Sequence, residues 1–228
     1  MGHITNENLK FLKALGANND RDWFAENKPE YQKHHEVMVS FADELLGMMN
    51  QHDNIETLNG KKSLQRIYRD VRFSKDKSPY KTHWGGGFKR ATKLLRGGYY
   101  YHIQPNGNSF IGGGFWGPNK EDLLRIREDI ASDASELREI ITSPEFVDTF
   151  GQLQGDQLKS SPKGFDKEHP DVDLLRYKQF LVGKHFTDKE VLADDFIEKA
   201  NDTFKKMRPF FDYMSEVLTT DSNGSPLF

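Results

Sequence analysis

The chain has 228 residues, with 32 Lys or Arg against 35 Asp or Glu and no cysteine. The lack of cysteine excludes disulfides, thiol nucleophiles and cysteine-ligated metal clusters, and 29% charged with 12% aromatic residues indicates a folded rather than a disordered chain. No run of ~18 apolar residues is available to cross a membrane, and residues 1–30 are too polar for a secretory signal, so we predict a cytoplasmic protein with no membrane partner.

Two helices are expected within the first 50 residues. Leucines at three-residue spacing, preceded by Thr5 and Asn6 and followed by Gly16, predict a short helix with both caps. A longer helix should begin near Pro29, because proline suits the first helical position. Apolar residues at three- or four-residue intervals then carry this helix to about Asn50 and give it one face that packs on a core.

Alternating apolar and polar residues from Leu64 to Phe73 predict a strand. Arg69 breaks the pattern, because the alternation places it on the apolar face. A buried guanidinium without a partner is costly, so we expect Arg69 to meet a carboxylate, line a polar cavity or lie at a bulge. The glycines at 85–87 lack the spacing of a phosphate-binding loop and are interpreted as a turn.

A hairpin is predicted from two further strands, Tyr99–Gln104 and Ser109–Trp116, which flank the turn residues 105–108. Alternation puts Tyr101 on the core side of the first strand and Tyr100 on the other side. There, Tyr100 and the residues of the same parity would form the wall of a cleft beside the preceding basic segment, or would simply pack as in any sheet.

The second half of the sequence indicates mainly helices. One helix should start at Pro118 and end before Ser143, and residues 155–171 are rich in loop-forming residues. A short strand is expected from Phe180 to Val182. The last long helix contains Pro209, which is expected to kink it.

These elements predict the α+β class, with a central, mainly antiparallel sheet and helices from both chain ends packed on it. No repeat or low-complexity linker divides the sequence. Residues 1–218 are therefore interpreted as a single α+β domain and residues 219–228, which are rich in Ser, Thr, Asn and Gly, as a flexible C-terminal tail.

Positive charge is concentrated in one segment. Residues 61–96 contain twelve Lys or Arg against two Asp, a local charge of +10 that leaves −13 for the rest of the chain. Aromatic residues alternate with these cations, as phosphate pairing combined with base stacking would require. The same composition also fits a solvated basic patch whose charges pair with acidic helices.

Within this segment we predict a pocket for a small anionic ligand that carries a phosphate or a carboxylate. Arginine offers a planar fork to such groups and lysine a mobile point charge. Arg69 and Arg72 would form the fork, Lys77 and Lys81 the rim, and residues 112–114 part of the wall. The predicted ligand-binding residues are Arg69, Arg72, Lys75, Lys77, Tyr80, Lys81, Trp84 and Tyr100.

Other functions of the same segment remain open. The cations could form an internal network with acidic residues such as Asp171 and Asp173. An enzyme, a hydrolase or a transferase, would use Asp70, Asp76 or His102 as a base. An interaction module would bind protein or nucleic acid on this cationic face, nucleic acid being the less favoured partner. No catalytic residue and no cofactor is assigned. No metal is assigned either, because the histidines lack metal-ligand spacing.

Five segments together resemble the bacterial and fungal family called domain of unknown function 2461. The most specific is RDVRFSKDKSPYKT at Arg69–Thr82. The others are NNDRDWF at Asn18–Phe24, GGYYYHI at Gly97–Ile103, GGGFWGP at Gly112–Pro118 and LKSSPKGFDKEHPDVDLLRYKQF at Leu158–Phe180. The resemblance covers about residues 8–218 and implies a single cytoplasmic α+β domain. It supplies no established activity and no catalytic residues.

Overall fold

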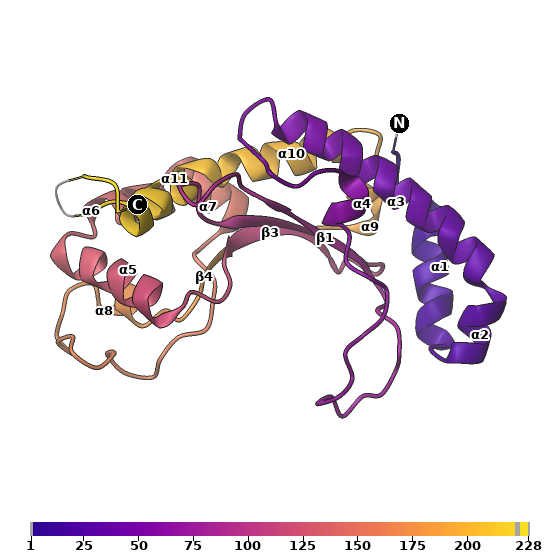
Figure 1. Ribbon diagram of the computed structural model, residues 1–228, viewed down its shortest axis with the longest axis horizontal. Coiled ribbons are helices and arrows are strands. Elements are labelled where there is room, and N and C mark those ends of the chain that lie inside the picture. The colour runs from indigo at the N-terminus through magenta and orange to yellow at the C-terminus, as the bar shows by residue number, and fades with distance from the viewer. Residues whose placement is uncertain (1, 222–223, 228) are drawn as a thin grey trace. The chain divides into compact units, whose positions relative to one another are not determined.

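The computed structural model describes residues 2–221 and 224–227 (Figure 1). An antiparallel sheet is combined with helices that precede and follow it, which confirms the predicted α+β class. Its strands are neighbours in chain order: β1 (Trp84–Lys89), β2 (Gly98–Ile103), β3 (Ser109–Phe115) and β4 (Phe180–Phe186). None of the helices in the described residues has both the length and the hydrophobicity needed to span a bilayer.

The chain forms two compact units, each assembled from separate stretches of sequence. Unit 1 comprises Met1–Phe88, Tyr100–Ile111 and His185–Asp202, and unit 2 comprises Lys89–Tyr99, Gly112–Lys184 and Thr203–Phe228. The helices of unit 1 are α1 (Asn6–Ala17), α2 (Arg21–Glu26), α3 (Lys28–Met49), α4 (Gly60–Ser63) and α9 (Asp188–Val191). Those of unit 2 are α5 (Lys120–Ser132), α6 (Ser135–Thr142), α7 (Pro144–Phe150), α8 (Val172–Leu175) and α11 (Arg208–Thr219), while α10 (Phe196–Lys206) has residues in both.

The predicted N-terminal helices are confirmed. At the start of α1 the Asn8 side chain accepts a hydrogen bond from the Thr5 N–H (2.8 Å), which satisfies a backbone donor that the helix cannot. Proline in the first turn begins α3, and the helix ends at Met49. The leucine stripe of α1 and the apolar face of α3 are buried, so the periodicity in the sequence identified the right faces.

The core of unit 1 forms where α3 packs on the sheet. Tyr101 of β2 is fully buried, its ring lies edge-on to Phe41 of α3, and its hydroxyl lies 2.9 Å from Ser63 Oγ. A Cβ at Gly86 would lie 2.1 Å from the Tyr101 hydroxyl oxygen. The prediction of a turn at residues 85–87 is therefore wrong: these glycines belong to β1, and Gly86 has no side chain because Tyr101 occupies that space.

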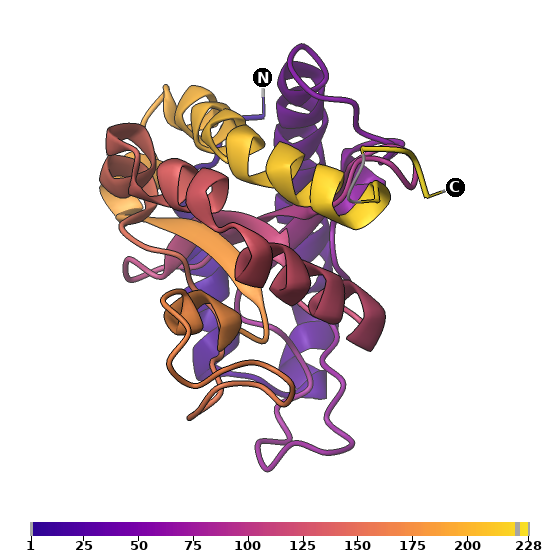
Figure 2. The same cartoon turned by 90° about the vertical axis from the view of Figure 1, so that its left-hand side faces the viewer.

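The predicted strand from Leu64 to Phe73 is also wrong. The segment forms no regular strand within the described residues, and its β-type pairing there consists of two isolated bridges, Leu64 to Gly86 and Tyr68 to Tyr80. Figures 1 and 2 show it as part of an irregular loop that extends from the beginning of β1. Alternation of apolar and polar residues in this segment therefore reflects one buried side chain, Ile67, between the half-buried Leu64 and Val71 in a loop rather than a sheet.

Two long helices are interrupted. The predicted helix from Pro118 to Ser143 breaks between α5 and α6, because Asp133 is extended and its carboxylate accepts the Ser135 N–H (2.9 Å) in place of a helical carbonyl. The predicted kink at Pro209 is confirmed, since α10 ends at Lys206 and Pro209 lies in the first turn of α11. β4 extends four residues beyond the predicted strand end at Val182, to Phe186.

The predicted tail, 219–228, is partly described, because residues 222–223 and 228 lie outside the described residues. In the rest, the Leu227 N–H donates to the Thr219 carbonyl (2.9 Å) and the Asp221 N–H donates to the Ser225 carbonyl (2.9 Å). These bonds attach the described part of the tail to the end of α11.

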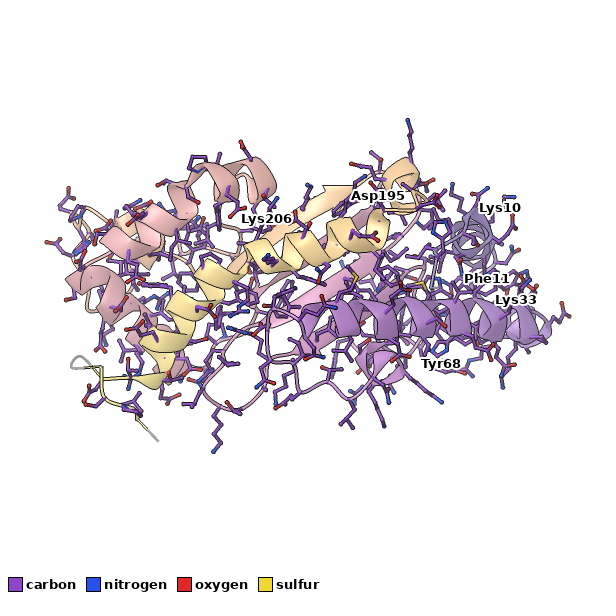
Figure 3. The ribbon with its side chains drawn as sticks, turned by 90° about the horizontal axis from the view of Figure 1, so that it is seen from above. Lys10, Phe11, Lys33, Tyr68, Asp195 and Lys206 are labelled. Atoms are coloured by element: carbon purple, nitrogen blue, oxygen red, sulfur yellow. The ribbon has the colours of Figure 1, made fainter. Side chains whose placement is uncertain are left out.

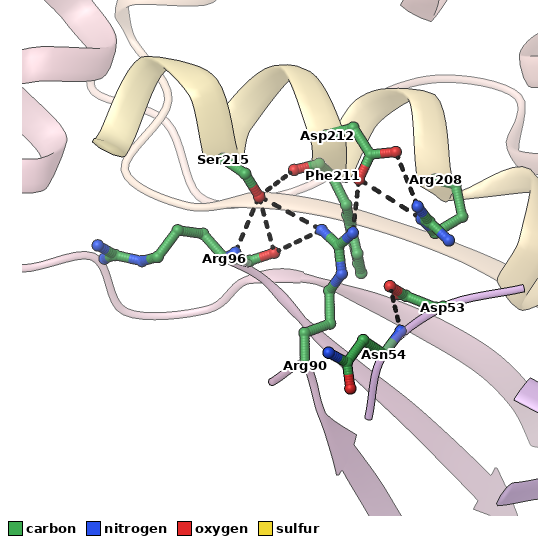
Figure 4. A network of polar contacts seen from close by, with 8 residues as sticks. All are labelled: Asp53, Asn54, Arg90, Arg96, Arg208, Phe211, Asp212 and Ser215. Atoms are coloured by element: carbon green, nitrogen blue, oxygen red, sulfur yellow. Dashed lines mark hydrogen bonds and ion pairs between the residues drawn. The ribbon is translucent and has the colours of Figure 1, made fainter. Parts of the chain in front are cut away.

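A buried guanidinium organises part of unit 2 (Figure 4). The Arg90 side chain is 0% exposed and pairs with Asp212 of α11 at 2.5 Å. It also donates to the Arg96 carbonyl (3.1 Å) and to Ser215 Oγ (3.3 Å), and Asp212 accepts from Arg208 (3.0 Å) as well. Because an unpaired buried charge is strongly unfavourable, this network holds the connection between β1 and β2 against α11.

We expect Asp212→Ala to lower the free energy of unfolding by about 2–4 kcal/mol, because it removes a carboxylate that pairs with the buried Arg90 guanidinium. The matched control is Glu216→Ala, which removes an exposed carboxylate one turn further along α11 and should change stability by less than about 0.5 kcal/mol. Urea denaturation followed by circular dichroism measures both. Equal stability of the two variants would contradict a structural role for the Arg90 pair.

Candidate ligand-binding site

The basic loop, residues 65–82, is held together at its stem by backbone hydrogen bonds. The Arg69 N–H donates to the Pro79 carbonyl (2.9 Å), and the Lys81 N–H donates to the Ile67 carbonyl (2.8 Å). The stem is thus an ordered pair of arms, and the tip between them carries most of the predicted anion-binding cations.

The arginines at the tip do not converge on one point. Arg69 pairs with Asp76 at 2.5 Å, whereas Arg72 pairs with Asp70 at 2.6 Å. Hydrogen bonds from Ser78 and from Arg69 lower the pKa of Asp76 to about 2, and the hydrogen bonds from Arg72 lower the pKa of Asp70. Each guanidinium therefore serves a local carboxylate, and the two do not form the predicted fork.

The internal network considered as an alternative exists, but with other partners. Asp171 and Asp173 both pair with Arg138 in unit 2, at 2.6 Å each, so they are not the counter-ions of the basic loop. Acidic residues within the loop itself neutralise Arg69 and Arg72. Local rather than long-range ion pairs explain how so basic a segment stays ordered.

The lysines of the predicted site have no carboxylate partner within the described residues. Lys75 is exposed and makes no hydrogen bond there, and Lys77 donates to the Val71 carbonyl (2.9 Å). Lys81 donates to Gln65 Oε1 (2.8 Å) and to the Arg66 carbonyl (3.0 Å), and partial burial lowers its pKa. Positive charge that is not neutralised thus lies on the lysines, including Lys81 at the root of the loop.

Tyr80 and Trp84 belong to the core, which corrects their interpretation as ligand-contacting residues. They are 5% and 3% exposed. Tyr80 stacks on Phe24 (ring centroids 4.0 Å apart), and Trp84 stacks on Tyr31 (5.4 Å) and on Phe11 (6.4 Å). Figure 3 labels Phe11 among the N-terminal helices. The two rings fasten the stem of the basic loop to the N-terminal helices and are not accessible to a ligand.

Tyr100 lies on the opposite side of β2 from buried Tyr101, as the alternation predicted. It belongs to a cluster of rings and one amide within unit 1, which we call the histidine face. Its members are His83, Tyr100, His102, Gln104, Phe110 and His185. The rings of His83 and His102 stack with centroids 4.1 Å apart, and His102 also stacks on Phe110 at 4.8 Å.

Two hydrogen bonds along β2 determine which ring nitrogen of His102 carries the proton. His102 Nε2 lies 2.8 Å from Gln104 Oε1, and His102 Nδ1 lies 3.3 Å from the Tyr100 hydroxyl. Because an amide oxygen only accepts, Nε2 carries the proton, and Nδ1 accepts from the Tyr100 O–H. His102 is thus held as a neutral imidazole of one tautomer.

Three members of the face, His83, Tyr100 and His102, are held uncharged at neutral pH. Burial, followed by the nearby His102 and Lys81, lowers the pKa of His83 to about 4, and burial lowers the pKa of His102. Burial also raises the pKa of Tyr100, which keeps its hydroxyl protonated. A flat, neutral surface of this kind suits stacking against a planar or sugar ring, with the Tyr100 hydroxyl available for hydrogen bonding.

The backbone of β1 leaves room for these side chains. A Cβ at Gly85 would lie 2.6 Å from the Tyr100 hydroxyl oxygen. The histidines stack rather than converge, and the described residues contain no group of three or more His, Asp or Glu that could hold a metal ion. His83, Phe110 and His185 were not predicted as site residues. The only signal for them was the parity of Tyr100 and His102, which identified the face but not its neighbours.

The comparisons with known proteins support the resemblance described above. A family profile described as "Conserved hypothetical protein (DUF2461)" matches residues 7–213. No curated protein and no solved structure matches the chain.

His83 should make the stability of the protein depend on pH. Its folded pKa of about 4 lies below the ordinary 6.5, so the unfolded chain takes up a proton that the folded chain does not. The contribution is complete above pH 6.5 and is lost as the pH falls toward 4. We expect wild type to lose about 1–2 kcal/mol more than His83→Gln between pH 7 and pH 4.5, allowing for partial exposure.

Urea denaturation at the two pH values tests this expectation. A loss of stability that is the same in wild type and in His83→Gln would contradict the assignment of a neutral, partly desolvated His83.

Proposed function

Because the chain belongs to the DUF2461 family of conserved hypothetical proteins, whose description names no activity, we propose its function from the histidine face: the protein binds a small anionic ligand that carries a flat ring. The observation that carries this proposal is the collection of neutral, half-buried rings on one face of β2, directly at the root of a loop that bears cations. Among the described residues, these rings contact aromatic rings of the histidine face and no others.

The ring of the ligand would lie on His102 and Phe110. These two rings are nearly parallel, at 15°, and form a platform rather than an interlocked core contact. A stacked aromatic contact contributes about 0.5–1.5 kcal/mol beyond the area that it buries. The neutral state of His102 removes the cost of desolvating a charge when a ligand covers it.

The anionic group of the ligand would lie at Lys81. Among the described residues, the ammonium of Lys81 is bonded only to neutral oxygens, and its charge helps to lower the pKa of His83. Arg69 and Arg72 are already paired with carboxylates, so a phosphate would gain less from them. The proposed site thus moves from the tip of the basic loop to its root and keeps Lys81 and Tyr100 from the residues predicted by sequence.

An enzyme at the same face is a second candidate, which the chain of hydrogen bonds from Tyr100 through His102 to Gln104 favours. His102 Nδ1 could take the proton of the Tyr100 hydroxyl, or of a substrate hydroxyl in its place, and so act as a general base in a hydrolase or transferase. Asp70 and Asp76 are poor candidates for that role, because their lowered pKa values make them weak bases.

The test is a thermal-shift screen with inorganic phosphate, sugar phosphates, nucleotides and aromatic carboxylates. A ligand at ~100 times its dissociation constant adds about 2.7 kcal/mol, which raises the melting temperature of a chain of this size by about 5–10 °C. A ring-bearing anion should produce this shift, and phosphate alone should produce a smaller one. His102→Ala and Lys81→Gln should each abolish most of the shift.

The matched control is Lys62→Gln, which removes an exposed cation of α4 outside the histidine face and should leave the shift unchanged. The proposal is wrong if no compound raises the melting temperature, or if the shift persists in both His102→Ala and Lys81→Gln.

A further inference from the structure

Two aromatic rings of the basic loop are exposed, and the histidine face does not use them. Phe73 at the tip is 96% exposed, the highest value among the large apolar side chains that the structure describes, and Tyr68 in the stem is 52% exposed. Isolated exposed apolar residues are common on proteins. Two exposed rings within six residues of a cationic loop are a different case, because ring and charge alternate along the same short segment.

The stem holds Tyr68 in place. Its ring contacts Tyr80 (centroids 5.5 Å apart) and Phe24 (6.4 Å), both of them buried, and the bridge between residues 68 and 80 fixes its backbone. Tyr68 is therefore a platform that is rigid on one side and accessible on the other. A ring that is already ordered loses little conformational entropy when a partner stacks on it.

Phe73 has a cation at its side. The Arg72 guanidinium carbon lies 5.9 Å from the centre of the Phe73 ring, and Arg72 is tethered by Asp70. Lys75 follows two residues later and has neither a hydrogen bond nor an ion pair in the described part of the chain. The tip thus offers a ring face with a mobile positive charge beside it.

Several cations in and next to the loop have no carboxylate partner among the described residues, in contrast to Arg69 and Arg72. They are Lys61, Lys62, Arg66, Lys75, Lys77 and Lys81. The remainder of the chain outside residues 61–96 has a charge of −13, which would repel an extended polyanion. Contact with such a partner would therefore be confined to the loop and would involve only a few of its charges.

We propose that the basic loop binds a short stretch of single-stranded nucleic acid, with bases stacked on Phe73 and Tyr68 and phosphates neutralised by Arg66 and Lys75. Single strands present bases and phosphates in alternation, and proteins bind them without sequence preference through aromatic platforms and cations. A duplex hides its bases and would engage the charges alone.

The arrangement fits an anionic membrane less well. Insertion into a bilayer needs apolar side chains gathered at one tip, whereas Tyr68 lies in the stem and the tip around Phe73 also carries Asp70 and Asp76. This inference does not rest on the ligand proposed for the histidine face, because it uses other side chains.

The experiment measures fluorescence anisotropy of a labelled 15-nucleotide oligo-dT and of a duplex of equal length, with the full chain at low and at physiological salt. Phe73→Ala should weaken binding of the single strand by about fivefold to a hundredfold, the range expected for one stacked base. Lys75→Gln and Arg66→Gln should each reduce the slope of log affinity against log salt by about 0.7.

The matched controls are Trp116→Ala, which removes a ring that is also exposed but lies outside the loop, and Lys163→Gln, which removes an exposed lysine elsewhere. Both should bind the single strand as wild type does. Because Phe73 is almost fully exposed, Phe73→Ala should keep the wild-type melting temperature, so a loss of binding would not reflect misfolding.

Three results would overturn the proposal. The first is no binding of the oligonucleotide at low salt. The second is equal affinity for single strand and duplex with no effect of Phe73→Ala, which would show attraction by charge alone. The third is binding only to vesicles that contain phosphatidylserine, which would identify a membrane surface as the partner.

Discussion

Strand β2 has to serve two surfaces at once, and most of unit 1 follows from that constraint. Side chains of a strand alternate between its faces, so the burial of Tyr101 against Phe41 places Tyr100 and His102 on the opposite face of β2. A shift of one residue would bring His102 into the core and expose Tyr101. The hydrophobic core therefore determines where the histidine face lies. The positions of Tyr100 and His102 depend on the packing of Tyr101 against Phe41 on the other side of the strand.

Charge in the central segment is organised at two levels. Most of the arginines are paired with aspartates, either one a few residues away, as at Arg69 and Arg72, or a distant one, as at Arg90, whereas Arg66 has no carboxylate partner among the described residues. Among the lysines, Lys77 and Lys81 donate to neutral oxygens. This division agrees with their chemistry, because a guanidinium forms several directed bonds in a partly dry site whereas an ammonium remains strongly hydrated. The local charge of +10 thus overstates the positive charge that a partner would meet.

Much of the fold follows from local signals in the sequence. The proline at 29, the turn at 105–108 and the alternation of β2 are each read within about ten residues, and each is confirmed. The failures occur where the deciding partner is remote. Gly86 lies in a strand because it makes room for Tyr101, and Arg90 is buried because Asp212 meets it, yet neither partner can be identified from the local pattern. For the site, parity identified Tyr100, but the stacking of His83 on His102 depends on the pairing of β1 with β2.

The arginines that hold the tip of the basic loop are exposed to solvent, whereas Arg90 is buried. The two regions therefore open at different rates. The pairs of Arg69 and Arg72 are open to solvent and weakened by salt, whereas the guanidinium of the Arg90 pair is fully buried. The tip of the loop can therefore open and close many times while the rest of unit 1 stays folded, whereas release of Arg90 requires the region around α11 to come apart. A partner that arrives at the loop thus meets a segment that can adjust its shape without any cost to the core.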